Sequence, residues 1–521
     1  MSKAVIQPFE EYQKSRIMFV QTVAELAIRK QNIDALNSLG VIKLLGPLLS
    51  DPVTSVKQSA ALAIGRLAKS NMEIAKAVIE EKSRIIPQLI ESKDTNNKFF
   101  KKAACFVIAE VSKHSKELAN KVCEENAIHF LITCLEEYDP SVKETAAWAL
   151  GVIAKSSPVL AEKIVTEGAV DMLKNCLQEP EIEIKRYAVQ TLSFIAKHSE
   201  HLTNSVTSRG DNLNVICYYL NSKDIELKRK IILCLAHMAN NSTSVANSIL
   251  EIIPQAIFLD CIRSVQDEYV QINTIGLLNE IAIKKMENAQ KINTLIGFVH
   301  IVEFLNRNKA KEKGDARLAG LSLISNISEY SKELVESLME VNVLKPLSEI
   351  IDNEENQKIK SLACKAIGHL ASQTADIANK IARYDRLAQK LLVLYLHKHS
   401  GNELRDCSKK ALDSVIQVCD KLDTLQPLLE GVKMEFNETL YEDVLIGLMK
   451  RLKDILSANK PERKDFIKKG GPLEKIMTLK GTYKRLVDEV KQFGEFYSNE
   501  IMNYYSKEYE NQIIEKFLKE G

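Results

Sequence analysis

A repeat of about 42 residues organises this chain of 521 residues and limits what it can fold into. One apolar column recurs at spacings of 41 to 46 residues. Its members are Leu26, Leu67, Val111, Ile153, Ile195, Met238, Ile281, Ile327, Leu370 and Val415. The residue three positions earlier is apolar each time, so each repeat contains a helix with an i, i+3 core stripe. A helical unit of this size cannot bury its apolar face alone, and the repeats must therefore stack on their neighbours.

Turn residues divide the repeat into three helices. Proline follows an acidic residue at Asp51-Pro52, Asp139-Pro140 and Glu179-Pro180, and it cannot continue the preceding helix. Glycine breaks the chain before another helix at Gly40 and Gly168. A short helix, a second helix and a long third helix are typical of the armadillo repeat rather than the two-helix HEAT repeat. The sequence therefore predicts an all-α armadillo-repeat solenoid, and the armadillo pattern implies a right-handed superhelix.

Between the two apolar positions of the long helix stands a mostly small residue. Gly65, Gly151 and Gly368 are examples, and they predict close approach of neighbouring helices. The repeat predicts about ten armadillo units over residues 1–420, whereas the period fades over residues 421–521 although helical periodicity continues. Because a terminal repeat must turn one face to water, we expect the second region to be a divergent helical C-terminal cap.

Charge and apolar patterning exclude several classes of protein. The chain has 71 Lys and Arg against 69 Asp and Glu, a net charge of +2, which argues against a dedicated nucleic-acid coat protein. The N-terminus lacks the apolar core of a signal peptide, and no apolar run is long enough to span a bilayer, so we expect a soluble intracellular protein that binds neither nucleic acid nor membrane. The ten cysteines are never closer than 11 residues, and they are expected to be buried core thiols.

The sequence offers no catalytic, cofactor-binding or metal-binding motif. It has no glycine-rich phosphate loop, no GxSxG elbow and no HExxH pair, and no third ligand accompanies His198 and His201. The Lys-His-Ser triplets at residues 113–115 and 197–199 recur at the same repeat position, which indicates helix termination rather than a nucleophile and its base. We therefore predict a protein that is not an enzyme and needs no cofactor.

A column of basic residues begins the long helices, ten residues before the main apolar column. Its members are Arg16, Lys57, Lys101, Lys143, Lys185, Lys228, Arg317, Lys360 and Arg405, with Gln271 as the exception. A cation at a helix N-terminus opposes the helix dipole, so helix stability alone does not explain the column. It could bind an acidic extended partner, or each head could pair with a nearby acid such as Asp51, Asp139 or Asp224. A large loss of stability on charge reversal at Lys143 or Lys185 would support the pairing alternative.

Two further basic patches lie outside the repeat pattern and are secondary candidates for binding. The first occupies a lengthened loop with Arg307, Lys309, Lys311 and Lys313, and the second comprises Lys460, Arg463, Lys464, Lys468 and Lys469. Loops of this kind are usually only solvated.

Several motifs resemble the sperm-associated antigen six family, the armadillo proteins of the ciliary central apparatus. They are FEEYQK (9–14), VAELA (23–27), QNI (31–33), FFKKAA (99–104), DPSVKETAAWAL (139–150), QEPEI (178–182) and KR (185–186). GGPLEKI (470–476) and YYSKEY (504–509) extend the resemblance beyond the repeats, and residues 201–215 and 241–320 depart from it. The Trp and Asn ladder of nuclear-import adaptors is not matched, because Trp148 is the only tryptophan.

The resemblance implies a structural component of the C1 microtubule side of the axonemal central pair, in the cytoskeleton and cytoplasm of cilia and flagella. Its implied role is to bridge the tubulin lattice and other central-apparatus proteins, and copies of itself, in support of central-pair stability and motility. Acidic tubulin tails would suit the basic column. The alternative is a soluble armadillo adaptor for transport or signalling complexes.

Overall fold

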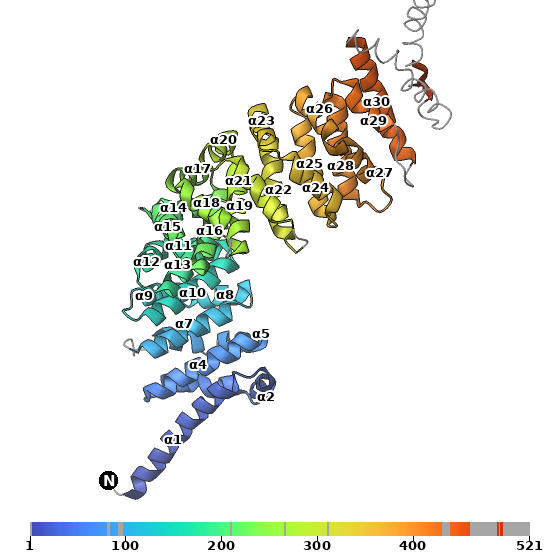
Figure 1. The fold of residues 1–521 in the computed structure, drawn as a ribbon. Helices are drawn as coiled ribbons and strands as arrows, with labels where there is room; N and C mark the ends of the chain where they lie inside the picture. Colours follow the sequence, from blue (N-terminus) through green and yellow to red (C-terminus); the bar gives the residue numbers. More distant parts are fainter. Residues whose placement is uncertain are drawn as a thin grey trace, which may run out of the picture. The chain divides into compact units, whose positions relative to one another are not determined.

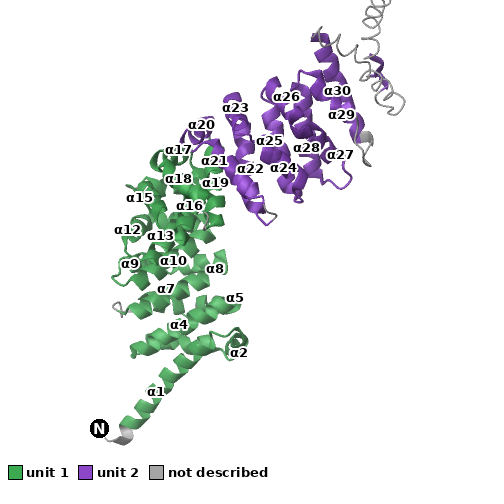
Figure 2. Cartoon of the chain, in the orientation of Figure 1, with its two compact units in different colours: residues 1–284 green, residues 285–521 purple. Residues whose placement is uncertain are grey.

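The computed structural model describes residues 3–80, 84–91, 97–208, 211–264, 267–309, 312–429, 438–458, 487–488 and 490–492. The chain divides into two compact units, Met1–Lys284 and Lys285–Gly521, which we call unit 1 and unit 2 (Figure 2). Every secondary-structure element within the described ranges is a helix.

Long helices form the spine of each unit and contain the apolar column. In unit 1 they are α1 (Lys3–Leu26), α4 (Thr54–Ser70), α7 (Lys98–Ser112), α10 (Pro140–Ser156), α13 (Ile182–Ala196), α16 (Ile225–Asn241) and α19 (Glu268–Ala282). In unit 2 they are α22 (Gly314–Ser328), α25 (Gln357–Ala371) and α28 (Asn402–Val418). Within each unit, consecutive long helices pack directly against one another in chain order (Figure 1).

Two shorter helices separate each pair of consecutive long helices within a unit. In unit 1 they are α2 (Ile33–Ser38), α3 (Val41–Leu45), α5 (Met72–Ile79), α6 (Ile85–Glu91), α8 (Lys116–Glu124), α9 (Ala127–Leu135), α11 (Pro158–Thr166), α12 (Ala169–Gln178), α14 (Glu200–Thr207), α15 (Asn212–Tyr218), α17 (Thr243–Ile252) and α18 (Gln255–Arg263). In unit 2, α20 (Met286–Leu295) and α21 (Phe298–Arg307) precede α22, and the other helices are α23 (Lys332–Glu340), α24 (Leu344–Asn353), α26 (Ala375–Arg383), α27 (Leu387–Leu396), α29 (Leu422–Leu429) and α30 (Glu438–Ala458). Short 3-10 turns are η1 (Lys30–Asn32), η2 (Gly46–Ser50), η3 (Tyr219–Asn221) and η4 (Tyr384–Arg386).

The predicted helical solenoid of three-helix repeats is confirmed, and the apolar column forms its core. Nine of the ten column residues are buried. Leu26 is the exception at 40% exposure, because it ends the first helix, α1. The number of repeats and the boundary of the C-terminal region near residue 420 stay a prediction.

Helix ends follow the predicted capping chemistry. Ser115 accepts a hydrogen bond from the backbone N–H of Leu118 at the start of α8, and Ser199 does the same for Leu202 at the start of α14. The Nε2 atoms of His114 and His198 lie 2.6 and 2.7 Å from the carbonyl oxygens of Ala68 and Ala154, which belong to the last turns of other long helices. The Lys-His-Ser triplets therefore terminate helices, as predicted, and their histidines also join neighbouring repeats.

Small residues on the long helices allow the predicted close approach. A Cβ atom at Gly151 would lie 2.6 Å from Oγ1 of Thr191 on the next long helix, and one at Gly368 would lie 3.0 Å from Cα of Ala411. The second contact is with backbone, which cannot move aside by a change of rotamer.

Gly368→Ala is expected to lower the free energy of unfolding by about 1 to 3 kcal/mol, because the new methyl group would push α25 and α28 apart. Gly276→Ala is the matched control, since nothing lies within 4 Å of its added Cβ in the middle of α19. That control should instead raise stability by about 0.5 to 1 kcal/mol, because alanine favours a helix interior over glycine. Urea unfolding followed by circular dichroism measures both, and equal effects would contradict the close-packing argument.

The cysteines are buried, as predicted. Nine of the ten are buried and Cys407 is half-buried, and none is in a disulfide. Burial raises the pKa of the Cys123 thiol to about 12, so this side chain is a neutral core residue at physiological pH.

Candidate functional site

Five of the nine basic side chains of the predicted column pair with acids within the chain. Lys101 pairs with Glu137, and Lys143 pairs with Glu179. The other observed ion pairs of the column are Arg16 with Asp51, Lys228 with Asp260 at 3.2 Å, and Arg317 with Glu354 at 2.8 Å. Each pair joins a long helix to the second short helix of the next repeat or to the residues that end it, so the pairs tie successive repeats together. Four of the five basic residues lie near the start of their long helix, but Arg16, predicted to begin one, lies in the middle of α1, which starts at Lys3.

The remaining members of the column have different surroundings. The ammonium group of Lys185 lies 4.5 Å from the centre of the Tyr219 ring, a cation–π contact. Arg405 donates a hydrogen bond of 3.2 Å to the carbonyl oxygen of His397. Lys57 is half-buried, and Lys360 lines a cavity of about 650 Å³ in unit 2. Pairing within the chain, one of the two alternatives from the sequence, is thus observed for five members, while binding of an outside partner by the column stays a prediction.

The acids suggested as partners of the column are engaged in similar contacts. Asp51 pairs with Arg16 as suggested, but Asp139 pairs with Lys98 at 2.9 Å and Asp224 with Arg186. Hydrogen bonds from Ser141, together with Lys98, hold the pKa of Asp139 at about 2. These contacts add further links between neighbouring repeats.

The basic side chains of the first secondary patch do not form one cluster, because two of them bind different partners within unit 2. Lys309 pairs with Glu349, and Lys313 donates a hydrogen bond of 3.1 Å to the side-chain oxygen of Asn308. Arg307 is exposed at the end of α21. Lys311 lies outside the described residues, as do Lys460, Arg463, Lys464, Lys468 and Lys469 of the second patch.

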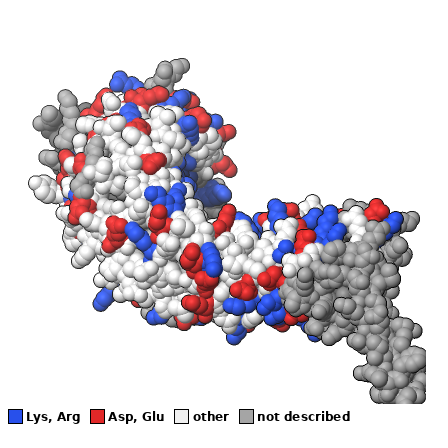
Figure 3. Space-filling view, turned by 90° about the horizontal axis from the view of Figure 1, so that it is seen from above, with Lys and Arg blue, Asp and Glu red and all other residues white. Residues whose placement is uncertain are grey.

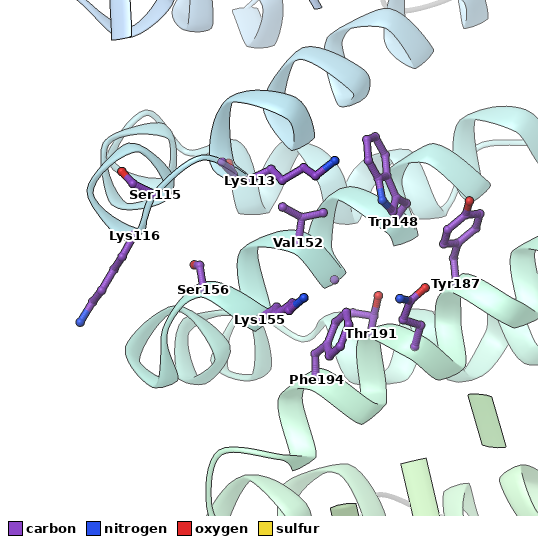
Figure 4. Close-up of a pocket in the computed structure, with 13 residues that line it drawn as sticks. Lys113, Ser115, Lys116, Trp148, Val152, Lys155, Ser156, Tyr187, Thr191 and Phe194 are labelled. Carbon is purple, nitrogen blue, oxygen red and sulfur yellow. The ribbon is translucent and has the colours of Figure 1, made fainter. Parts of the chain in front are cut away.

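A pocket of about 380 Å³ opens between α7, α10 and α13 in unit 1, and the sequence analysis did not predict it. Its apolar walls are Trp148, Val152, Tyr187 and Phe194. Its polar lining consists of Lys113, Lys116, Lys155, Gln190, Thr191 and the serines 112, 115 and 156. Figure 4 shows Lys113 and Lys155 extending on either side of Val152 toward the aromatic side of the pocket. None of the residues that line it is acidic. We call it the lysine pocket.

Aromatic pockets flank the lysine pocket along the same long helices. On one side a cavity of about 580 Å³ is lined by Phe99, Phe106, Trp148 and residues of α4, and the Phe106 and Trp148 rings stack with their centres 6.2 Å apart. On the other side, a cavity of about 270 Å³ lies over α13, α16 and α19 and is lined by Phe194 and Tyr269. The long helices of unit 1 thus present a row of aromatic pockets.

A second lysine column lies along this surface, two residues after the apolar column. Its members, Lys69, Lys113, Lys155 and Lys197, are exposed and stand at the same position in four successive repeats. The sequence contains this column, because a lysine recurs at the same repeat position at spacings of 42 to 44 residues. In the sequence, Lys113 and Lys197 are interpreted only as residues that end helices. A cation at a helix C-terminus does favour the helix dipole, so the column stabilises its helices and also presents charge to the surface.

Partial burial perturbs charged groups near the row of pockets. Burial raises the pKa of Glu144, assisted by Glu183 and opposed by Lys102. Burial lowers the pKa of Lys230, whose ammonium donates a hydrogen bond of 2.9 Å to Gln190. On the face drawn in Figure 3, Lys and Arg are interspersed with Asp and Glu. A one-signed lining such as that of the lysine pocket is therefore distinctive.

Over the described ranges, no cluster of three or more His, Cys, Asp and Glu side chains could hold a metal ion. In the same residues no single helix is long and apolar enough to cross a membrane, although two strongly bent pairs, residues 30–50 and residues 243–263, pass that test together by length and composition.

A stretch of 102 residues is 54% identical to mouse sperm-associated antigen 6 and 53% identical to the human protein. The chain resembles sperm-associated antigen 6. The predicted resemblance is confirmed over this stretch, which spans 20% of the chain and 20% of the length of each relative. The family described as Cnd1, non-SMC mitotic condensation complex subunit 1, matches residues 124–257, well under half of the chain.

Solved structures support the fold. The crystal structure of an engineered protein from the Northeast Structural Genomics Consortium matches 77% of this chain and 94% of its own, with a TM-score of 0.69 and 20% identity. A designed armadillo repeat protein in complex with the peptide (KR)4 matches 46% of this chain and 99% of its own, at a TM-score of 0.43, which is too low to carry an argument. At these identities the likeness shows the fold and says nothing of a ligand.

Proposed function

We propose that the chain is a non-catalytic structural scaffold of the axonemal central pair, on its C1 microtubule side. It bridges the tubulin lattice and other central-apparatus proteins, and it binds copies of itself where they repeat along the axoneme. The single observation that carries this proposal is the identity of 54% with mouse sperm-associated antigen 6 over 102 residues. The proposed role of the chain within the central pair rests on the resemblance of its sequence motifs to those of the family.

The repeated fold supports a scaffold physically. Stacked helical repeats offer long surfaces on which several partners can bind at once. Ion pairs such as Lys101 with Glu137 and Lys143 with Glu179 link one repeat to the next, and such links hold a surface in one shape under load. A structural role in a beating axoneme needs that property more than it needs a catalytic site.

Localisation in a motile cell tests the proposal. The full chain carrying an epitope tag is expected to remain with axonemes after detergent extraction and to appear on the central pair in immunogold sections. Cells that lack the chain should show central pairs that are lost or displaced and a beat of reduced amplitude. Purified full-length chain should also sediment with microtubules. A diffuse cytosolic distribution, fully removed by detergent, would favour the transport or signalling adaptor instead.

A further inference from the structure

The lysine pocket is set apart from its neighbours by the sign of its charge. Lys113, Lys116 and Lys155 line it without an acidic residue. By contrast, Glu144 accompanies Arg66 and Lys102 in the cavity beyond Trp148, and Glu226 accompanies Arg229 and Lys230 in the cavity beyond Phe194. Because one sign of charge in a concave site attracts the opposite sign, the lysine pocket favours an anionic ligand.

The heads of Lys113 and Lys155 are available to such a ligand, whereas Lys116 extends away from the aromatic side chains (Figure 4). The Lys113 side chain is 60% exposed, and among the described residues the only acid within 4 Å of its ammonium group is Glu110, at 3.9 Å. The Lys155 ammonium lies 5.5 Å from the centre of the Phe194 ring, and no carboxylate in the described part of the chain comes within 4 Å of it. Both lysines are exposed, unlike Lys101 and Lys143, whose side chains are only 14% and 15% exposed.

The pocket also has an apolar side that a small anion would leave unused. Trp148, Tyr187, Val152 and Phe194 line it, and the Lys113 and Lys155 side chains extend toward the aromatic rings (Figure 4). Aromatic walls of this kind hold apolar side chains at protein interfaces, and the central anchors of such interfaces carry most of the binding energy. The ligand that uses both sides carries carboxylates next to an apolar side chain.

The second lysine column sets the length of the ligand. Lys69 on α4 and Lys197 after α13 stand on either side of Lys113 and Lys155 in the repeat order. Neighbouring helices pack about 8 to 10 Å apart, so the four lysines span about 24 to 30 Å. An extended chain rises about 3.3 Å per residue, and a segment of about eight or nine residues therefore spans them.

We propose that the lysine pocket and the second lysine column bind an extended acidic peptide segment, with an apolar side chain of that segment seated between Trp148 and Phe194. The proposal rests on the proposed scaffold function and names the chemistry of one of its partners. A peptide is favoured over a nucleic acid because the net charge of the chain is only +2 and because Glu144 and Glu226 lie in the flanking cavities, where they would repel a continuous phosphate backbone.

The experiment measures binding of one probe to the full chain. The probe is a fluorescein-labelled peptide of ten residues, with glutamates around a single central phenylalanine. Fluorescence polarisation is expected to show saturable binding that weakens as salt increases, because exposed charges are screened. Trp148 is the only tryptophan of the chain, so an unlabelled peptide of the same sequence should also shift its emission.

Variants of the chain distinguish binding at the lysine pocket from nonspecific electrostatic attraction of the acidic peptide to other exposed lysines. Lys113→Ala with Lys155→Ala should weaken binding at least tenfold, whereas Lys113→Arg with Lys155→Arg should retain it. Lys43→Ala with Lys76→Ala is the control, because these exposed lysines also lie in last helical turns of unit 1, on α3 and α5. It should bind as the parent does.

Changes to the peptide test the two halves of the ligand. Replacing its glutamates with glutamines should abolish binding, and replacing its phenylalanine with alanine should weaken binding and remove the tryptophan shift. The proposal is overturned if the parent chain does not bind, if both lysine pairs weaken binding equally, or if a ten-nucleotide oligothymidine binds more tightly. An axonemal location without peptide binding would refute this inference alone, and peptide binding without an axonemal location would refute the scaffold role alone.

Discussion

Replacement of Arg317 with methionine is expected to lower the free energy of unfolding of unit 2 by about 3 to 5 kcal/mol, because it breaks a buried ion pair. The Arg317 side chain is 4% exposed and that of its partner Glu354 is 8% exposed. Arg317 also donates a hydrogen bond of 3.1 Å to the carbonyl oxygen of Lys309. The substitution leaves the nearly buried Glu354 carboxylate without its cation. Its remaining hydrogen bonds come from the backbone N–H groups of Glu355 and Asn356, at 3.0 and 2.9 Å. Loss of the cation from such a position costs far more than the loss of an exposed pair.

The partner substitution separates charge from packing. Arg317→Met combined with Glu354→Leu should recover most of the lost stability, because a buried pair can often be replaced by apolar side chains of similar volume. Chemical unfolding of the full chain, followed by circular dichroism, measures the free energy of unfolding of the parent, the single variant and the double variant. If Arg317→Met is as stable as the parent, the pair is an exposed contact, and Arg317 becomes available to an outside partner as the sequence analysis allowed.

The repeat is the part of the fold that the sequence predicts best. A buried column such as Leu67, Val111 and Ile153 depends on spacing within one helix, which is read directly from the sequence. Leu26 is exposed although the spacing predicts that it is buried. Burial depends on which helices surround a residue, and the 42-residue spacing does not show that the first long helix ends at Leu26. The short helices and their caps follow from local residues such as Ser115 and Ser199, and they too were predicted.

The candidate site was harder to predict because it depends on residues of different repeats. The partner acids of Arg16, Lys101, Lys143 and Arg317 stand 35 to 37 residues after them, a regular offset that the sequence contains. The residue 36 positions after Lys185 is Asn221, and there the Tyr219 ring takes the place of an acid. An acid at this offset is thus a signal for four of the five pairs. Lys228 departs from it, because it pairs with Asp260, 32 residues later.

The lysine pocket could not be found from spacing alone. Lys113, Trp148 and Phe194 occupy three different positions of their repeats, and only the packing of α7, α10 and α13 brings them around one cavity. The absence of acids from its lining is likewise a property of the surface and not of any one segment.

Charge reversal at Lys143 is expected to lower the free energy of unfolding of unit 1 by about 2 kcal/mol, since it replaces an attraction with a repulsion. Lys143 is 15% exposed and its partner Glu179 is 28% exposed, so water screens the pair less than a pair on the open surface. In Lys143→Glu two carboxylates would face each other between the start of α10 and the end of α12.

The exchanged pair is the decisive control. Lys143→Glu combined with Glu179→Lys restores opposite charges and should regain most of the stability, with a coupling energy of about 2 kcal/mol between the two sites. Thermal unfolding of the four proteins in low and high salt measures that coupling, which should shrink as salt increases. If Lys143→Glu leaves stability unchanged but weakens binding to microtubules, Lys143 is free to meet a partner and the first basic column, not the second, is the surface that recognises acidic chains.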